Sequence, residues 1–465
     1  MSRIDAALLG EDMSSHLARL DRGELDCRGL LEQQLAAISA SGPVINAYLA
    51  VDAGAARRAA DESDARRKAG TARVLEGVPV AIKDNIDAAG FVTTAGMATR
   101  RDATEAGVDS PAVARLRDAG AVILGKLNMH EAALGADNNN PHFGACHNPH
   151  RPGFTPGGSS GGSGAAVAAG LCSAALGTDS MGSVRIPASY CGVVGLKPSW
   201  GAISTRDTVA LSHRLDHIGP LARSARDLRL LLPVLAGFDP ASAQSRAIHF
   251  APVSTGPLRL GVVSFGDTVE FEPGIAEAFE DGLQTLLGLG HQRVDLHAPA
   301  FAPGHSRRAG LLVCEAEMLI EHADDWQHKR ELFSPLLQKL MAYAERKSAS
   351  DLVDAVRVLD QAQVQLQQWL AQCDVLVMPT TLQRAFSFDT PTPADQADLT
   401  GYANFAGNPA LSVPLAVADG ELPLGLQLVG DIGAEMQLIA LAEAFQQTIC
   451  WQPSLPQACT NWWPQ

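Results

Sequence analysis

The chain is short of positive charge and of long apolar runs, and each shortage excludes a class of partner. Lysine and arginine number 36 against 51 acidic residues, which gives a formal net charge of −15 over 465 residues. Nucleic acid and anionic lipid both require a positive surface, so we expect neither as a partner.

The longest uncharged stretch, residues 152–178, is built mainly from Gly, Ser, Ala and Pro and is too weakly apolar to span a membrane. Acidic residues at positions 5, 11 and 12 interrupt the start where an export signal needs an apolar core, which predicts a cytoplasmic protein.

Paired cysteine motifs are also missing. The eight cysteines form no C-x-x-C pair and no zinc spacing, which indicates reduced and mostly buried thiols. In "NNNPHFGACHNPH", His142, His147 and His150 lie in an Asn/Pro/Gly loop without helical spacing. We therefore expect no metal site there.

The composition and the order of apolar segments predict an α/β fold. A hydrophobic fraction of 46% with 19% charged residues is typical of a chain that folds throughout. Amphipathic helices alternate with short strands, and we expect these strands at residues 78–82, 121–124, 258–265, 293–296, 374–380, 410–417 and 425–430. The alternation predicts a sheet covered by helices on both faces within one large domain, residues 1–465. Residues 305–372 are helical, charged and Gln-rich, which is typical of an insertion beside the sheet.

The stretch "TPGGSSGGSG" at residues 155–164 can be interpreted in several ways. A flexible linker is disfavoured because the stretch runs directly into "AAVAAGLCSAAL", which favours a packed helix. A P-loop is disfavoured because no lysine stands between Lys126 and Lys197. Residues 158–162 fit the nucleophile elbow G-x-S-x-G of an α/β-hydrolase-type serine esterase, with Ser160 as nucleophile and His213 or His217 as triad partner. An elbow needs a preceding strand, which "HRPGFTP" disfavours.

A second small-residue segment, "GTDSMGSVRIPASYCGVVGLKP" at residues 177–198, predicts an oxyanion hole. An apolar segment ends at Asp179 and a turn of small residues follows. Such a turn can point successive backbone N–H groups into one concavity. We expect the donors to be the N–H groups of Ser180, Met181, Gly182 and Ser183.

These segments, together with "VPVAIKDNID" at residues 78–87, closely resemble the amidase signature family of serine hydrolases. The segments "NFAGNPALSVPLAV" and "LPLGLQLVG" extend the resemblance over most of the chain, and it is weakest between about residues 240 and 400. The resemblance implies a mixed, twisted sheet with a signature core at about residues 74–205. It also implies a variable, mostly helical substrate-pocket region at about residues 300–400.

By this resemblance Ser183 is the nucleophile, Ser159 is a bridging serine whose preceding peptide bond is cis, and Lys83 is the terminal base. A serine hydroxyl is a poor nucleophile until a base removes its proton, so Lys83 must be neutral. Neutrality requires its pKa to fall from about 10.4 to about 7 or 8. Burial at a strand end lowers a lysine pKa, whereas a facing acid raises it, so we expect Asp84 and Asp87 to point elsewhere.

The resemblance also implies supporting residues. Asp179 and Arg185 shape the oxyanion turn through hydrogen bonds or an ion pair, and the alternative is a surface salt bridge. Ser160 orders the loop and does not react. Met181 stands where the family usually has glycine, so its N–H is retained while its thioether narrows or reshapes the pocket.

These assignments predict a serine hydrolase that cleaves small linear amides through an acyl-enzyme, without a cofactor. Esters and carbamates present the same electrophilic carbonyl and are expected substrates as well. One alternative is the amidase component of a glutamine-dependent amidotransferase, disfavoured because Ile186 stands where those proteins commonly have Gln. A non-catalytic binding protein on this fold is disfavoured because Lys83, Ser159 and Ser183 are all present. A homodimer is a family expectation.

Overall fold

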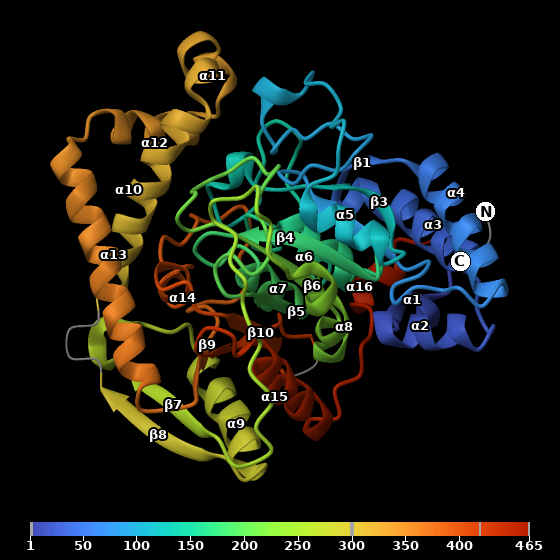
Figure 1. Ribbon diagram of the computed structural model, residues 1–465. Helices are drawn as coiled ribbons and strands as arrows, with labels where there is room; N and C mark the ends of the chain where they lie inside the picture. Colours follow the sequence, from blue (N-terminus) through green and yellow to red (C-terminus); the bar gives the residue numbers. More distant parts are fainter. Residues whose placement is uncertain (1–2, 298–301, 418–419, 464–465) are drawn as a thin grey trace.

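Every strand predicted from the apolar runs forms, and all of them join one sheet. The computed structural model describes residues 3–297, 302–417 and 420–463 (Figure 1). Its described strands form an 11-stranded sheet in the order β1-β3-β2-β4-β6-β5-β10-β11-β9-β7-β8. The strands are β1 Tyr48–Val51, β2 Pro79–Lys83, β3 Val122–Leu127, β4 Ala174–Asp179, β5 Val194–Lys197, β6 His217–Ala222, β7 Arg259–Ser264, β8 Gln292–His297, β9 Val375–Pro379, β10 Ala410–Pro414 and β11 Gly425–Val429.

Parallel and antiparallel pairs alternate in blocks along this sheet. Strand β2 is parallel to β3 and to β4, and β7 is parallel to β8 and to β9. The strands between these blocks pair antiparallel, including β4 with β6 and β10 with β5 and β11. The prediction of an α/β fold with a mixed sheet is confirmed.

Helix ends follow local capping signals. Helix α5 has Pro111 at its first position, with the Ser110 hydroxyl accepting from the Val113 N–H. Helix α13 begins with a capping box made by Ser348 and Asp351. The helices are α1 Ala6–Gly10, α2 Met13–Asp21, α3 Cys27–Ile45, α4 Ala53–Lys68, α5 Pro111–Asp118, α6 Gly161–Ala168, α7 Arg185–Cys191, α8 Ala225–Leu235, α9 Ile275–Gly288, α10 Pro303–Glu321, α11 Ala323–His328, α12 Pro335–Glu345, α13 Ala349–Leu370, α14 Gly401–Phe405, α15 Glu435–Thr448 and α16 Gln457–Thr460.

Side-chain alternation along the strands assigns helices to the two faces. Val80 and Ile82 of β2 belong to a core shared with α2, α5, α8, α9 and α15, whereas Ala81 faces a core shared with α3, α4, α6 and α7. Farther along the sheet, the face opposite the first core is covered by α10, α12, α13 and α14. Both faces are therefore covered, as predicted. Because successive residues of a strand alternate in direction, Lys83 points to the same face as Ala81, toward α6.

The predicted helical insertion forms α10 to α13, which stand together beside the sheet (Figure 1). Strands β1, β5 and β6 were not predicted, and β6 in particular contains a glycine and a proline that weaken a strand pattern. In the described part of the chain, no helix combines the length and the apolar character that crossing a membrane would need. The cytoplasmic location stays a prediction.

Candidate active site

Lys83 ends strand β2 and is fully buried. Its Nζ lies 2.7 Å from the Ser159 hydroxyl oxygen and 2.7 Å from the Thr178 hydroxyl oxygen, with the Thr178 carbonyl oxygen at 3.5 Å. Burial lowers the pKa of Lys83 to about 7, although the carboxylates of Asp216 and Asp179 act in the opposite direction. A large fraction of this amine is therefore neutral near pH 7 and able to accept a proton.

The acid next to Lys83 in the sequence turns away from it. Asp84 forms a buried ion pair with Lys126 at 3.3 Å and accepts hydrogen bonds from the backbone N–H and the hydroxyl of Thr94. Burial lowers the pKa of Lys126, and the negative charge of Asp87 partly offsets this by raising it. These contacts confirm for Asp84 the expectation that it points away from the amine of Lys83, and Asp87 is not among the groups that shift the pKa of Lys83.

Ser159 is presented to Lys83 by an unusual backbone. The peptide bond between Gly158 and Ser159 is cis, which confirms the prediction for this bond. The Ser159 carbonyl oxygen accepts a 3.1 Å hydrogen bond from the His130 N–H. Hydrogen bonds therefore hold both the side chain and the backbone carbonyl of Ser159.

Ser160 is bound on every polar atom that would matter for reactivity. Its hydroxyl donates to the Thr178 carbonyl oxygen at 3.1 Å and accepts from the Thr178 N–H at 3.2 Å. Its own N–H donates to the Ser183 carbonyl oxygen at 3.2 Å. The residue is fully buried, and no strand precedes it among described residues 151–159, where Arg151 and Phe154 make only isolated bridges. The nucleophile-elbow interpretation is wrong, because an elbow exposes its serine at the end of a strand.

The turn after β4 carries the candidate oxyanion donors, and one of the four is already engaged. The Gly182 N–H donates to Asp179 Oδ1 at 2.7 Å. The prediction that this N–H group is an oxyanion donor is therefore wrong. The N–H groups of Ser180, Met181 and Ser183 donate to no group in the described residues. The Ser183 side chain is half-buried, and its hydroxyl has no hydrogen bond to any described residue. Three backbone donors and one hydroxyl are thus available on this turn.

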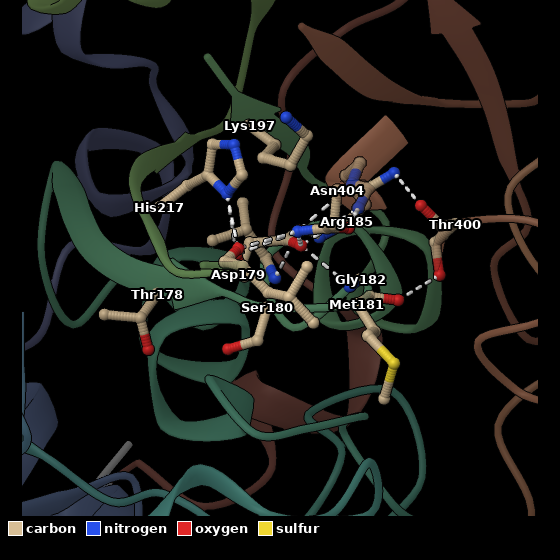
Figure 2. Close-up of polar contacts among 12 residues, drawn as sticks. Thr178, Asp179, Ser180, Met181, Gly182, Arg185, Lys197, His217, Thr400 and Asn404 are labelled. Atoms are coloured by element: carbon tan, nitrogen blue, oxygen red, sulfur yellow. Dashed lines mark hydrogen bonds and ion pairs between the residues drawn. The ribbon is translucent and has the colours of Figure 1, made fainter. Parts of the chain in front are cut away.

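Asp179 and Arg185 form a buried ion pair behind the turn, so the surface salt-bridge alternative is wrong. Two guanidinium nitrogens lie 2.9 and 3.0 Å from the carboxylate oxygens, and both side chains are 0% exposed. Arg185 also donates to the Thr400 carbonyl oxygen and to Asn404 (Figure 2). It donates to Gln427 Oε1 as well. Burial alone would raise the pKa of Asp179, but the Arg185 guanidinium holds it well below its usual range.

The conformation of the turn depends on glycine at position 182. Gly182 has φ +132°, and a Cβ there would collide with the Thr400 hydroxyl and lie 2.9 Å from Ile186 Cδ1. The Thr400 hydroxyl donates to the Met181 carbonyl oxygen at 2.6 Å. In Figure 2, the hydroxyls of Thr178 and Ser180 and the thioether of Met181 project to the side of the turn away from the ion pair. We call this the reaction side.

The histidines considered for other chemistry have different partners. His217 is fully buried behind the turn, where its Nδ1 contacts the Asp179 carbonyl oxygen at 3.2 Å (Figure 2). The same Nδ1 contacts the Leu215 carbonyl oxygen at 2.7 Å. Burial lowers its pKa well below the usual value, so it is neutral. His213 lies at the surface and contacts Gln244. Neither contacts Ser160, as a triad based on that serine would require.

The three loop histidines do not converge. His142 lies 2.8 Å from Glu131, His147 accepts from the Gly153 N–H, and His150 contacts the Cys191 carbonyl oxygen. Among the residues that the structure describes, no three or more His, Cys, Asp or Glu side chains form a group able to hold a metal ion.

The sequence model of the family described as Amidase matches residues 29–439. The chain belongs to the amidase family. Among curated relatives, a glutamyl-tRNA(Gln) amidotransferase component from Roseiflexus castenholzii is 36% identical, over 94% of this chain and 96% of that protein. A solved structure described as part of a vestigial protein complex, which reveals the evolutionary origins of an s-triazine catabolic enzyme, has TM-score 0.87 and 32% identity, and covers 96% of this chain and 99% of that chain. The 6-aminohexanoate cyclic dimer hydrolase has TM-score 0.86 and 28% identity, and covers 97% of this chain and 99% of that chain.

Membership confirms the resemblance inferred from the motifs. The fold is that of the amidase signature enzymes, and the chain is a member of a family of hydrolases that act on the C–N bond of amides.

Four polar side chains of this amidase site were not predicted. Thr178 holds Lys83, while Asp216 accepts a 2.6 Å hydrogen bond from the Ser180 hydroxyl. Thr400 and Asn404 reach the turn from α14 and the residue before it. Asn404 lies within the resembling segment "NFAGNPALSVPLAV", which is the one signal in the sequence that points toward α14.

Proposed function

We propose that this protein is a serine amidase in which Ser183 forms the acyl-enzyme, Ser159 relays the proton and Lys83 is the base. The observation that supports the proposal most strongly is the 2.7 Å contact between Ser159 Oγ and the amine of Lys83. Burial lowers the pKa of this amine to about 7. A neutral amine in a hydrogen bond to a serine is an arrangement suited to activating a nucleophile. Ser183 is half-buried and belongs to the turn that carries the unengaged backbone N–H groups.

In acylation, Ser183 Oγ attacks the amide carbonyl carbon while its proton passes to Ser159, and the Ser159 proton passes to Lys83. The carbonyl oxygen becomes an oxyanion and accepts hydrogen bonds from the N–H groups of Ser180, Met181 and Ser183. Loss of one such donor typically costs about 2.7–4 kcal/mol of transition-state stabilisation. Lys83 and Ser159 then return a proton to the amide nitrogen, which leaves as an amine.

Deacylation repeats these steps with water in place of Ser183. Lys83 accepts a proton from water through Ser159, and the hydroxide attacks the acyl carbon. The acid leaves and the proton returns to Ser183 Oγ. No step requires a metal or an organic cofactor. Small linear amides are the proposed substrates, and esters and carbamates, which carry the same electrophilic carbonyl, are proposed as additional ones.

A second candidate function is favoured by the curated relatives, which are named as components of glutamyl-tRNA(Gln) amidotransferase. Such a protein would release ammonia from an amide inside a larger assembly. Ile186 is buried beside Gly182, at the position where those proteins commonly have Gln, and this speaks for the free-standing amidase. Co-purification with an obligate partner, together with glutamine-dependent amidation, would decide for the second candidate.

The test is a panel of p-nitroanilides, aliphatic amides, esters and aryl carbamates, assayed with wild type and four alanine variants. Ser183→Ala, Ser159→Ala and Lys83→Ala should each lower kcat/KM by about 10³-fold or more, because these groups act as a unit. Ser160→Ala should lower kcat/KM far less. Its main effect should be a lower Tm. Activity that survives Ser183→Ala would falsify the proposal. Size-exclusion chromatography tests the expected homodimer.

A further inference from the structure

We propose that Met181 sets the length of the acyl group that this amidase accepts, because its thioether closes the acyl side of the site against α10 and α14. The inference rests on the proposed function, since it takes Ser183 as the nucleophile. It assigns the substrate class as amides of short aliphatic acids.

The proton relay determines on which side the acyl group lies. The leaving nitrogen must receive its proton from Ser159, so it lies on the side of the relay, where Lys83 binds Ser159 and Thr178. The other substituent of the carbonyl carbon must then extend in a different direction from Ser183. Figure 2 shows Thr178 and Met181 at opposite ends of the reaction side, with the Ser180 hydroxyl between them. The acyl group therefore extends toward Met181.

The Met181 side chain fills the space between the turn and the helices α10 and α14. Only 9% of the residue is exposed, and it belongs to the apolar core formed by α10, α12, α13 and α14. At Gly310 of α10, an added Cβ would lie 2.7 Å from Met181 Sδ and 2.9 Å from Phe405 Cε1. Glycine at 310 thus leaves a notch that the thioether occupies, with the Phe405 ring of α14 beside it.

The backbone of Met181 is held in place, so its side chain cannot move away as a unit. The Thr400 hydroxyl binds the Met181 carbonyl oxygen at 2.6 Å, and the following N–H, that of Gly182, binds Asp179 at 2.7 Å. A long acyl group would have to displace the thioether itself. Because the thioether of Met181 and the ring of Phe405 are both apolar, we assign aliphatic rather than charged acyl groups to this side of the site.

The experiment compares p-nitrophenyl esters and p-nitroanilides of acetate, butyrate, hexanoate and octanoate. The wild type should prefer the short members. Met181→Ala should raise the hexanoyl-to-acetyl ratio of kcat/KM at least about ten-fold, since misfit in an apolar pocket is worth that much or more. Gly310→Ala should lower the same ratio, because its Cβ pushes the thioether toward the site. The effect of Gly310→Ala should be much smaller in the Met181→Ala background.

Met318→Ala is the matched control. Met318 lies on the same helix as Gly310, in the same apolar core, and is fully buried. Its truncation should lower Tm but leave the hexanoyl-to-acetyl ratio unchanged within about two-fold. A similar rise in the ratio for Met318→Ala would mean that general loosening of the helices, and not Met181, sets the limit.

An unchanged ratio in folded Met181→Ala overturns the inference. If Met181→Ala does not fold, an unchanged ratio in Gly310→Ala overturns it equally. A shift confined to amine preference, measured with one acyl group on several amines, overturns the assignment of the acyl side. Activity of Ser183→Ala, or no turnover of the whole series by the wild type, contradicts the proposed function itself and is distinguishable from these results.

Discussion

The Thr400 hydroxyl donates a 2.6 Å hydrogen bond to the Met181 carbonyl oxygen, across 219 positions of the chain. This carbonyl shares a peptide plane with the Gly182 N–H, which donates to Asp179 Oδ1 at 2.7 Å. The plane is therefore held at both ends, one by the start of α14 and one by the end of β4. Fixing this plane also fixes the direction of the flanking N–H groups of Met181 and Ser183.

Thr400→Val should lower kcat at least about ten-fold with little change in KM, because it removes the donor without changing the shape of the side chain. A buried carbonyl left without its donor costs about 1–3 kcal/mol, and part of that cost should appear as a disordered oxyanion turn. Steady-state kinetics on a p-nitroanilide measure the effect. Thr381→Val is the control, because Thr381 is also buried and donates to a backbone carbonyl, that of Gln383. Equal losses of kcat in both variants would contradict a specific role for Thr400.

The pH profile of kcat/KM should show an acid limb near pH 7. The pKa of Lys83 is lowered to about 7 by burial, and only the neutral amine accepts the proton of Ser159. Activity should therefore rise as the pH increases through about 7 and level off above it. Lys83→Arg, which stays charged across this range, should lose about 10³-fold or more and show no such limb. A wild-type profile without a limb between about pH 6 and 8 contradicts the role of Lys83 as base.

Asp216→Asn should move that acid limb to lower pH. Burial raises the pKa of Asp216 to about 6, so its carboxylate is mostly ionised at pH 7 and attracts the proton of Lys83. Removing this charge lowers the pKa of Lys83 further, and the limb should shift by up to about one pH unit. Glu317→Gln is the comparison, because Glu317 acts on Asp216 but is not among the groups that shift Lys83. A shift of the limb to higher pH would show that the Asp216 carboxylate does not raise the pKa of Lys83.

Arg185→Leu should lower the free energy of unfolding by about 3–5 kcal/mol, because it leaves the buried Asp179 carboxylate without its cation. Urea denaturation measures this change. Arg293→Leu removes the cation of two surface pairs, with Glu280 and with Asp295, and should change stability by less than about 1 kcal/mol. Similar effects of the two substitutions would show that the Asp179–Arg185 pair does not stabilise the turn.

Much of the fold could be predicted because its signals are local. Apolar runs marked β2, β3, β7 and β9 to β11, and a proline at the first helical position marked α5. Strand β6 was missed because its sequence "HIGPLA" holds a glycine and a proline, yet the sheet accommodates it between β4 and β5. A weak strand is stabilised by its neighbours, which no local pattern records.

The parts of the site that depend on a short stretch of chain could be predicted from the sequence alone. Lys83 at the end of an apolar strand, the cis bond before Ser159 and the small-residue turn after Asp179 were all predicted from local residues or from the family resemblance. The atoms that those parts bind follow only from the three-dimensional fold. The Gly182 N–H is taken by Asp179, and the turn is held by Thr400 at the start of α14. The sheet order places β10, which follows α14, next to β5, which follows the turn. Hydrogen-bond partners are chosen by distance in space, and that distance is set by sheet order rather than by sequence spacing.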